Sequence, residues 1–134
     1  MSLFDSPRFL RYVLVADALS CVATGLAQLL FASMLAQWLA LPGNLLVGTG
    51  WFLLAYAAVV GFIATRDPIP SGFVWLFVAG NVAWAILCVV VLASGSIAPT
   101  TLGVAWILGQ AAVVVVLAEL QWTGLRRQAV ASWA

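Results

Sequence analysis

The sequence predicts an all-α membrane protein: a transmembrane up-down-up-down four-helix bundle with both termini in the cytoplasm. Of its 134 residues, 66% are hydrophobic and only 7% are charged, whereas about a quarter of the residues in soluble domains are charged. Long, continuously apolar runs alternate with short segments that end helices. Such runs exclude a transmembrane β-barrel, whose strands alternate apolar and polar residues. We therefore expect one transmembrane domain over residues 1–134.

The first span is expected at residues 9–38, because an apolar run there ends before Pro42-Gly43, a combination that stops helices. The run is about twice as long as the apolar core of a signal peptide and lacks a convincing cleavage site, so we expect a retained helix. It is also longer than one crossing of about 30 Å of hydrocarbon requires.

The other three spans are expected at residues 45–65, 72–93 and 100–122. A segment with two prolines ends the second span, a Ser-Gly pair ends the third, and Thr100 after Pro99 is expected to cap the fourth. Each run is long enough to cross the hydrocarbon at about 1.5 Å per residue. Because the connections are short, consecutive helices are expected to be antiparallel neighbours.

The fourth span is expected to end at Thr123-Gly124, which leaves residues 123–134 as a cytoplasmic or interfacial tail. Leu125, Ala129 and Trp133 recur at helical spacing beside two arginines, a pattern typical of a short helix that lies on the membrane surface. A frayed end of the chain is the alternative.

Charged residues predict the orientation of the bundle. The arginines precede the first span, separate the second from the third, and follow the fourth; they are Arg8, Arg11, Arg66, Arg126 and Arg127. The connections on the opposite side, residues 39–44 and 94–99, carry no charge. Because positively charged segments stay in the cytoplasm, both termini are expected there.

Two acids, Asp17 and Glu119, lie inside apolar runs instead of flanking them. Counted from the cytoplasmic ends of their spans, these acids and Asn81 reach a similar depth of about 9–12 Å. Acids at such depths generally face the bundle interior. Two neighbouring carboxylates in a low dielectric cannot both ionise cheaply, so the pair would share a proton, with Asn81 as a neutral donor. We expect these three residues to form a candidate site for a proton, a cation or the polar end of a ligand.

The same residues also have a purely structural interpretation. If the outer end of the long first span sets its depth, Asp17 lies at the headgroup level, and Glu119 lies close to the end of its own span. Either acid would then pair with Arg11 or Arg66 and orient helices without carrying any activity. One interhelical hydrogen bond would be enough to explain Asn81.

A second polar pair is expected closer to the outer boundary. Gln28 and Gln110 both lie about 14–15 Å from that boundary and are expected to form an interhelical hydrogen bond. Gly103 and Gln121 share the helix face of Gln110. Glu119, nine residues beyond Gln110, lies about 180° around the helix, so these two side chains cannot both face one cavity.

Several kinds of chemistry are excluded by the residues that the chain lacks. It contains no histidine and no lysine, which argues against haem ligation by histidine, histidine-based catalysis and a lysine nucleophile. No metal-ligand cluster, phosphate-binding loop or nucleophile elbow is evident. The net charge of +1 is dispersed over the chain, unlike a nucleic-acid-binding patch. We expect no enzyme activity, no cofactor, no metal and no nucleic-acid partner.

Two stretches near the ends of the chain carry a resemblance. They are RFLRYVLVADA at residues 8–18 and AELQWTGLRR at residues 118–127. Both resemble the ends of small uncharacterised four-helix bacterial inner-membrane proteins. The similarity covers most of the chain but rests largely on hydropathy, so no functional residue is carried over. It implies a multi-pass protein of a bacterial inner membrane.

Two functions fit these observations. In the first, the bundle is a small binding or transport module that holds a small apolar or amphipathic ligand, or a cation, in an apolar pocket lined by Tyr56, Trp84 and Trp106, with the acids at its polar end. In the second, it is a non-catalytic accessory subunit that packs against a larger membrane complex, which the minimal loops favour. The expected partners are membrane lipid and either a second copy of the chain or a larger complex.

Overall fold

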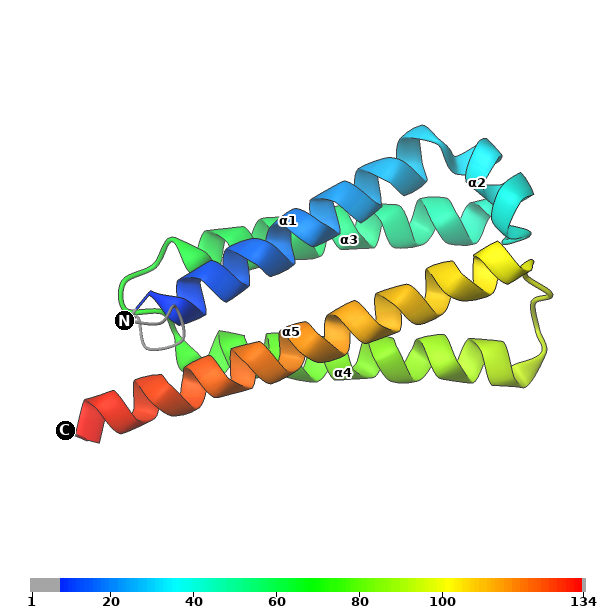
Figure 1. The fold of residues 1–134 in the computed structure, drawn as a ribbon. Coiled ribbons are helices and arrows are strands. Elements are labelled where there is room, and N and C mark those ends of the chain that lie inside the picture. The colour runs from blue at the N-terminus through cyan, green and yellow to red at the C-terminus, as the bar shows by residue number, and fades with distance from the viewer. Residues whose placement is uncertain (1–7, 134) are drawn as a thin grey trace.

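The computed structural model describes residues 8–133, with side chains as far as Arg127, and all regular secondary structure in this part of the chain is helical. Within it the helices are α1 (Phe9–Leu30), α2 (Ala32–Leu39), α3 (Gly43–Ala64), α4 (Ser71–Ser94) and α5 (Thr101–Trp133) (Figure 1). The predicted all-α class is therefore confirmed. Four of these helices, all except α2, are long and apolar enough to cross a membrane.

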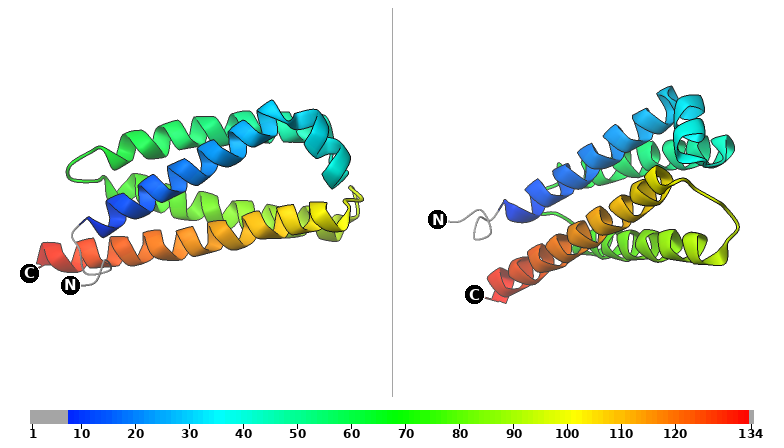
Figure 2. Two further views of the ribbon diagram at one scale, coloured as in Figure 1. Left: turned by 45° about the horizontal axis from the view of Figure 1, so that its top comes forward. Right: turned by 45° about the vertical axis from the view of Figure 1, so that its right-hand side comes forward.

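The predicted first span is divided at Phe31. The 22 residues of α1 measure about 33 Å at 1.5 Å per residue, which already matches the hydrocarbon thickness. Helix α2 then turns across the end of the bundle (Figure 2). No proline or glycine stands at the bend; instead, Leu39 and Leu41 are buried against Leu46 and Ile107. Burial of this apolar patch at the end of the bundle accounts for the bend.

The end of α2 is tied to the start of α5 by Thr100. The Thr100 amide donates to the Leu39 carbonyl at 3.1 Å, and its hydroxyl donates to the Trp38 carbonyl at 2.8 Å. The same hydroxyl accepts the Gly103 amide at 3.1 Å, so the predicted threonine cap is confirmed. A Cβ on Gly103 would collide with the Leu39 carbonyl oxygen. Glycine is therefore required where the two helix ends meet.

The long helices pack as two hairpins: α1 lies beside α3, and α4 lies beside α5 (Figures 1 and 2). We call these the first and second hairpins. In the first hairpin the backbones approach closely at Gly25 and Gly50, because a Cβ on Gly25 would lie only 2.9 Å from the Gly50 carbonyl oxygen. Such small-residue contacts hold helices together in lipid, where the hydrophobic effect between helices is absent.

The hairpins pack against each other near the end that carries the termini. Leu14, Val60 and Val74 are completely buried there in one apolar cluster. Helix α5 continues past Thr123-Gly124 to Trp133, so the predicted helix end at this pair is wrong. A Cβ on Gly124 would lie 2.9 Å from the Leu10 side chain. This glycine therefore permits a close crossing with α1 and does not end the helix.

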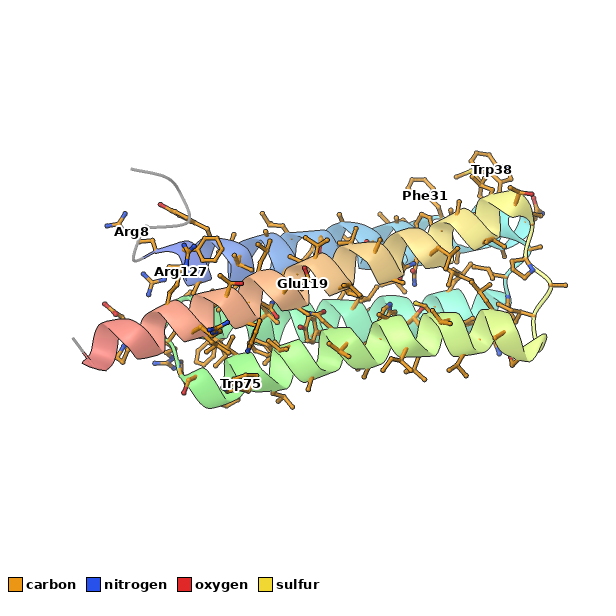
Figure 3. The ribbon with its side chains drawn as sticks, turned by 60° about the horizontal axis from the view of Figure 1, so that its bottom comes forward. Arg8, Phe31, Trp38, Trp75, Glu119 and Arg127 are labelled. Atoms are coloured by element: carbon orange, nitrogen blue, oxygen red, sulfur yellow. The ribbon has the colours of Figure 1, made fainter. Side chains whose placement is uncertain are left out.

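The arginines gather at this same end. Figure 3 shows Arg8 and Arg127 at one end of the bundle and Phe31 and Trp38 at the other. Arg11 donates from Nε to the Ala64 carbonyl at 2.9 Å and from its terminal nitrogen to the Arg66 carbonyl at 2.8 Å. An arginine at this position satisfies carbonyl groups that the last turn of a helix leaves without partners.

The side chains of the predicted tail are described only as far as Arg127. The predicted tail is helical, because α5 runs as one helix to Trp133. Leu125 is buried against the core, but the side chains of Ala129 and Trp133 lie outside the described residues. Whether the tail lies on a membrane surface therefore stays a prediction.

Candidate functional site

The centre of the bundle holds a completely buried carboxylate, Asp17, at 0% exposure. Its Oδ2 atom accepts a hydrogen bond from the Tyr56 hydroxyl at 3.0 Å, from Gln121 Nε2 at 2.7 Å and from Asn81 Nδ2 at 3.4 Å. Its Oδ1 atom accepts from the Cys21 thiol at 3.7 Å. Donors from α1, α3, α4 and α5 thus meet on one acid. We call these five residues the Asp17 cluster.

Helix periodicity places each member of the cluster. Cys21 lies one turn beyond Asp17 and therefore on the same face of α1. Asn81 and Gln121 are the buried amides of their helices, at 4% and 0% exposure. Asn81 Nδ2 also donates to Gln121 Oε1 at 3.1 Å. This bond lies within the second hairpin, and the bonds from Asn81 and Gln121 to Asp17 join the second hairpin to the first.

The carboxylate is surrounded by neutral donors. A buried charge is costly unless hydrogen bonds compensate it, and the cluster supplies several such bonds to Asp17. Arg11, one of the cations considered as its partner, donates instead to the carbonyls of Ala64 and Arg66. The buried side-chain nitrogen and oxygen atoms of the described residues all have hydrogen-bond partners.

The structure brings together two of the three predicted site residues. Asp17 and Asn81 meet in the cluster, but Glu119 is exposed on the outer surface of α5 (Figure 3). The predicted sharing of a proton between the two acids therefore has no geometric basis. Gln121, two residues beyond Glu119, lies about 200° around the helix. It occupies the position next to Asp17 that was expected for the acid.

Gln121 is the functional candidate that the sequence interpretation missed. Its signal was present, because Gln121 shares a helix face with Gln110, which we expected inside the bundle. The phase of α5 was the more reliable guide to which side chain points inward.

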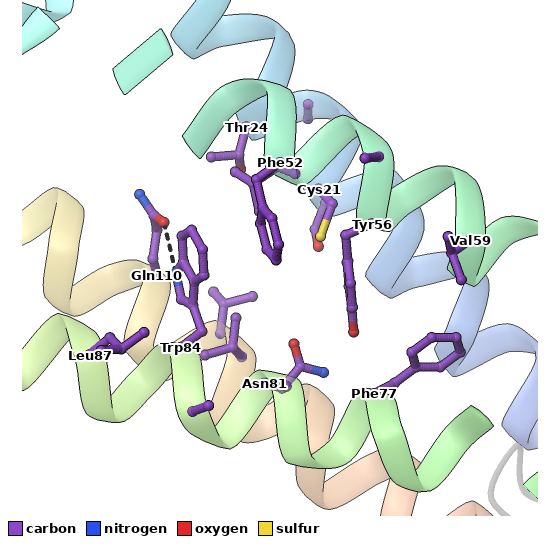
Figure 4. A pocket seen from close by; sticks show the side chains of 18 of the residues that line it. Cys21, Thr24, Phe52, Tyr56, Val59, Phe77, Asn81, Trp84, Leu87 and Gln110 are labelled. Atoms are coloured by element: carbon purple, nitrogen blue, oxygen red, sulfur yellow. Dashed lines mark hydrogen bonds between the residues drawn. The ribbon is translucent and has the colours of Figure 1, made fainter. Parts of the chain in front are cut away.

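A cavity of about 960 Å³ lies between the two hairpins, beside the Asp17 cluster (Figure 4). Its walls come from α1, α3, α4 and α5 and are mostly apolar. Tyr56, Trp84 and Trp106, which the sequence suggested for an apolar pocket, all line it.

Aromatic rings form one wall of this cavity. Phe52 stacks on Trp84 with ring centroids 5.8 Å apart and planes at 8°. Phe52 also lies 6.5 Å from the Tyr56 ring, and Phe77 meets the Tyr56 ring edge-on at 5.7 Å. Figure 4 shows these four side chains around the open space. An apolar or aromatic ligand would find flat surfaces on α3 and α4.

The polar end of the cavity is part of the Asp17 cluster. Cys21, Tyr56 and Asn81 line the cavity, whereas Asp17 and Gln121 do not. The carboxylate therefore lies directly behind the lining and acts on the cavity through the side chains that bond to it. Farther along the cavity, Trp84 Nε1 donates to Gln110 Oε1 at 3.3 Å.

The predicted Gln28–Gln110 pair is wrong. Gln28 Nε2 donates to the Leu46 carbonyl at 2.9 Å and to the Thr49 hydroxyl at 2.7 Å, both on α3, while Gln110 bonds to Trp84 on α4. Each glutamine thus bonds within its own hairpin. The two residues were matched by depth, and depth does not decide which helices are neighbours.

Among the described residues, no group of three His, Cys, Asp or Glu side chains is placed to hold a metal ion.

Comparisons with known proteins do not identify a family for this chain. No protein-family model, no curated protein and no solved structure matches this chain.

Proposed function

We propose that this protein is a multi-pass bacterial inner-membrane protein. In this proposal it binds or transports a small apolar or amphipathic ligand in the cavity between its hairpins. The observation that carries the proposal is the aromatic-lined cavity of about 960 Å³, one end of which is formed by side chains that bond to a buried carboxylate. Ligand sites combine an apolar enclosure with a few convergent polar groups. Ionisable residues inside membrane bundles commonly mark such sites.

The proposed topology is up-down-up-down with both termini in the cytoplasm. It is supported by the arginines, which lie at the end that carries both termini (Figures 1 and 3). At the opposite end, Thr100 joins the start of α5 to α2 through uncharged groups. This asymmetry agrees with the positive-inside rule.

We propose binding and not catalysis. The chain has no histidine or lysine, and Asp17 is the acid of the cluster. Its carboxylate bonds to neutral donors behind the cavity wall. A general base must reach the proton that it abstracts, and Asp17 is separated from a ligand by Tyr56 and Asn81.

Glycine-to-leucine substitutions test the cavity directly. Gly80 and Gly109 line it, and a Cβ on either meets nothing within 4 Å, so Gly80→Leu and Gly109→Leu should fill space without straining the backbone. Gly48→Leu is the matched control, because a Cβ there is equally unobstructed and Gly48 does not line the cavity.

The readout is the set of small molecules that co-purify with each variant, measured by solvent extraction and mass spectrometry. A ligand retained by the wild type and by Gly48→Leu should fall at least about tenfold in the cavity variants, because added side-chain volume costs kcal/mol-scale free energy in a packed site. Equal retention by all four proteins would refute the cavity as the binding site.

The second candidate is an accessory subunit of a larger membrane complex. It is favoured by α4, whose membrane-spanning segment is only 17% buried, the lowest share among the four spans of the described residues. Such a face suits lipid, a second copy of the chain or a partner subunit. A subunit role predicts that the cavity variants assemble with the same partner as the wild type.

A further inference from the structure

We propose that the ligand of this cavity is an amphipathic organic cation, an ammonium group on an apolar or aromatic body, whose N–H groups donate to Asn81 Oδ1 and Tyr56 Oη. This inference rests on the proposed function and names the chemical class of its ligand. Three observations carry it: the direction of the hydrogen bonds, the buried acid behind the cavity wall and the aromatic wall.

The hydrogen-bond direction makes the cavity lining an acceptor surface. Asn81 faces two acceptors inside the cluster, Asp17 Oδ2 and Gln121 Oε1, so its amide nitrogen must point inward. Its carbonyl oxygen is thereby left toward the cavity (Figure 4). Tyr56 donates its single hydroxyl proton to Asp17, so its oxygen can only accept a hydrogen bond from a ligand.

A buried acid lies behind this surface. Asp17 accepts hydrogen bonds at both carboxylate oxygens, which is the pattern of the ionised, acceptor-only form. The neutral donors around it compensate its desolvation but leave its net charge in place. In a low dielectric a unit charge acts over several ångströms, so the cavity favours a cation and disfavours an anion.

The aromatic wall suits the rest of such a ligand. The rings of Phe52, Tyr56 and Trp84 line the cavity next to the acceptor oxygens. Ring faces attract ammonium groups and pack against apolar bodies. The volume of about 960 Å³ accommodates a molecule of drug-like size.

Probes that share one skeleton and differ in the head group test this class. Tryptamine, tryptophol and indolepropionate present a cation, a neutral alcohol and an anion at neutral pH. Binding of radiolabelled tryptamine to the full-length protein in phosphatidylcholine nanodiscs is measured, with the other two as competitors and empty nanodiscs subtracted. Tryptamine should bind at least about tenfold more tightly than tryptophol, the gain expected of a hydrogen bond to a charged donor, and indolepropionate should bind least.

Variants assign the effect to the cluster. Asp17→Asn should reduce the preference for tryptamine over tryptophol to within about threefold, since the charge is lost while the side-chain size is kept. Tyr56→Phe keeps the ring and should weaken tryptamine more than tryptophol, because the hydrogen bond from a charged donor is the stronger of the two. Gln28→Leu removes an equally buried amide outside the cavity and should change neither affinity. Size-exclusion elution and thermal unfolding establish that each variant is folded.

The outcomes separate the two proposals. If tryptophol and tryptamine bind the wild type equally, and both are lost in Gly80→Leu, the cavity is a ligand site but the cation assignment is wrong. If Asp17→Asn and Tyr56→Phe both keep the wild-type preference, the cation assignment is also wrong. If none of the three probes binds above empty nanodiscs, the cation assignment and the proposed binding function both fail.

Discussion

Asp17 and its donors concentrate the strongest polar interactions of the bundle in one place. Three of the donors come from three other helices, so the acid orients α1, α3, α4 and α5 relative to one another. Its hydrogen bonds also fix which atoms of Tyr56 and Asn81 face the cavity. One residue thus links the packing of the helices to the chemistry of the site.

Asp17→Leu should destabilise the protein strongly, because the donors of Tyr56 and Gln121 lose their acceptor and Asn81 loses one of its two acceptors. Each unsatisfied buried group costs roughly 1–3 kcal/mol. Asp17→Asn should cost less, since it retains one acceptor oxygen. Thermal unfolding in detergent measures both variants against the exposed control Glu119→Gln, which should match the wild type. A melting temperature for Asp17→Leu equal to that of the control would contradict the cluster.

Gln121 and Glu119 provide a second contrast on a single helix. Gln121→Leu removes bonds to Asp17 and Asn81 and should lower stability by about 1–2 kcal/mol. Glu119→Leu changes an exposed position and should leave stability within about 0.5 kcal/mol of the wild type. Denaturant titration of the two variants measures the difference. The reverse order would mean that α5 is rotated by about half a turn.

At the scale of the helices, close packing of α1 and α3 depends on Gly25. A Cβ at this position would lie 2.9 Å from the backbone oxygen of Gly50, which has no flexible end to move. Gly25→Ala should therefore force the helices apart and cost about 1–3 kcal/mol. Gly48→Ala on α3 meets no atom within 4 Å and should be neutral or slightly stabilising, because alanine favours helix. Equal effects of the two variants on thermal unfolding would exclude the close contact.

The helices themselves could be predicted well, and their neighbours could not. Pro42-Gly43 and the prolines after Arg66 marked the ends of α1–α2 and α3 within a few residues. The bend at Phe31 has no proline or glycine signal, since contacts with α3 and α5 produce it. Gly124 resembled a helix end but serves a crossing with Leu10.

The depth of the candidate site residues along the helices could be predicted from the sequence, but the helix that each side chain faces could not. Counting from the helix ends placed Asp17 and Asn81 at one level, and they meet there. The same counting matched Gln28 with Gln110, which bond to different helices. Depth follows from the rise per residue, whereas contact also requires the rotation of each helix and the identity of its neighbour.

At the scale of the whole molecule, the two hairpins and the cavity between them form the framework for the proposed function. The arginine-bearing end predicts a definite orientation in the membrane. Ser71→Cys, beside the arginine-bearing connection, should react with a membrane-impermeant maleimide only in inverted vesicles. Ser96→Cys, at the opposite end, should react in intact cells. Cys21 and Cys88 lie within spans, so the wild type is the unlabelled control, and the opposite labelling pattern would invert the topology.

Native mass spectrometry of the wild-type protein released gently from its own membrane tests the central claim most directly. The account predicts the mass of the chain, or of a homo-oligomer, together with a small bound molecule that is absent from Gly80→Leu and present in Gly48→Leu. An empty protein held in a stoichiometric complex with a different subunit would contradict the binding function and favour the accessory role.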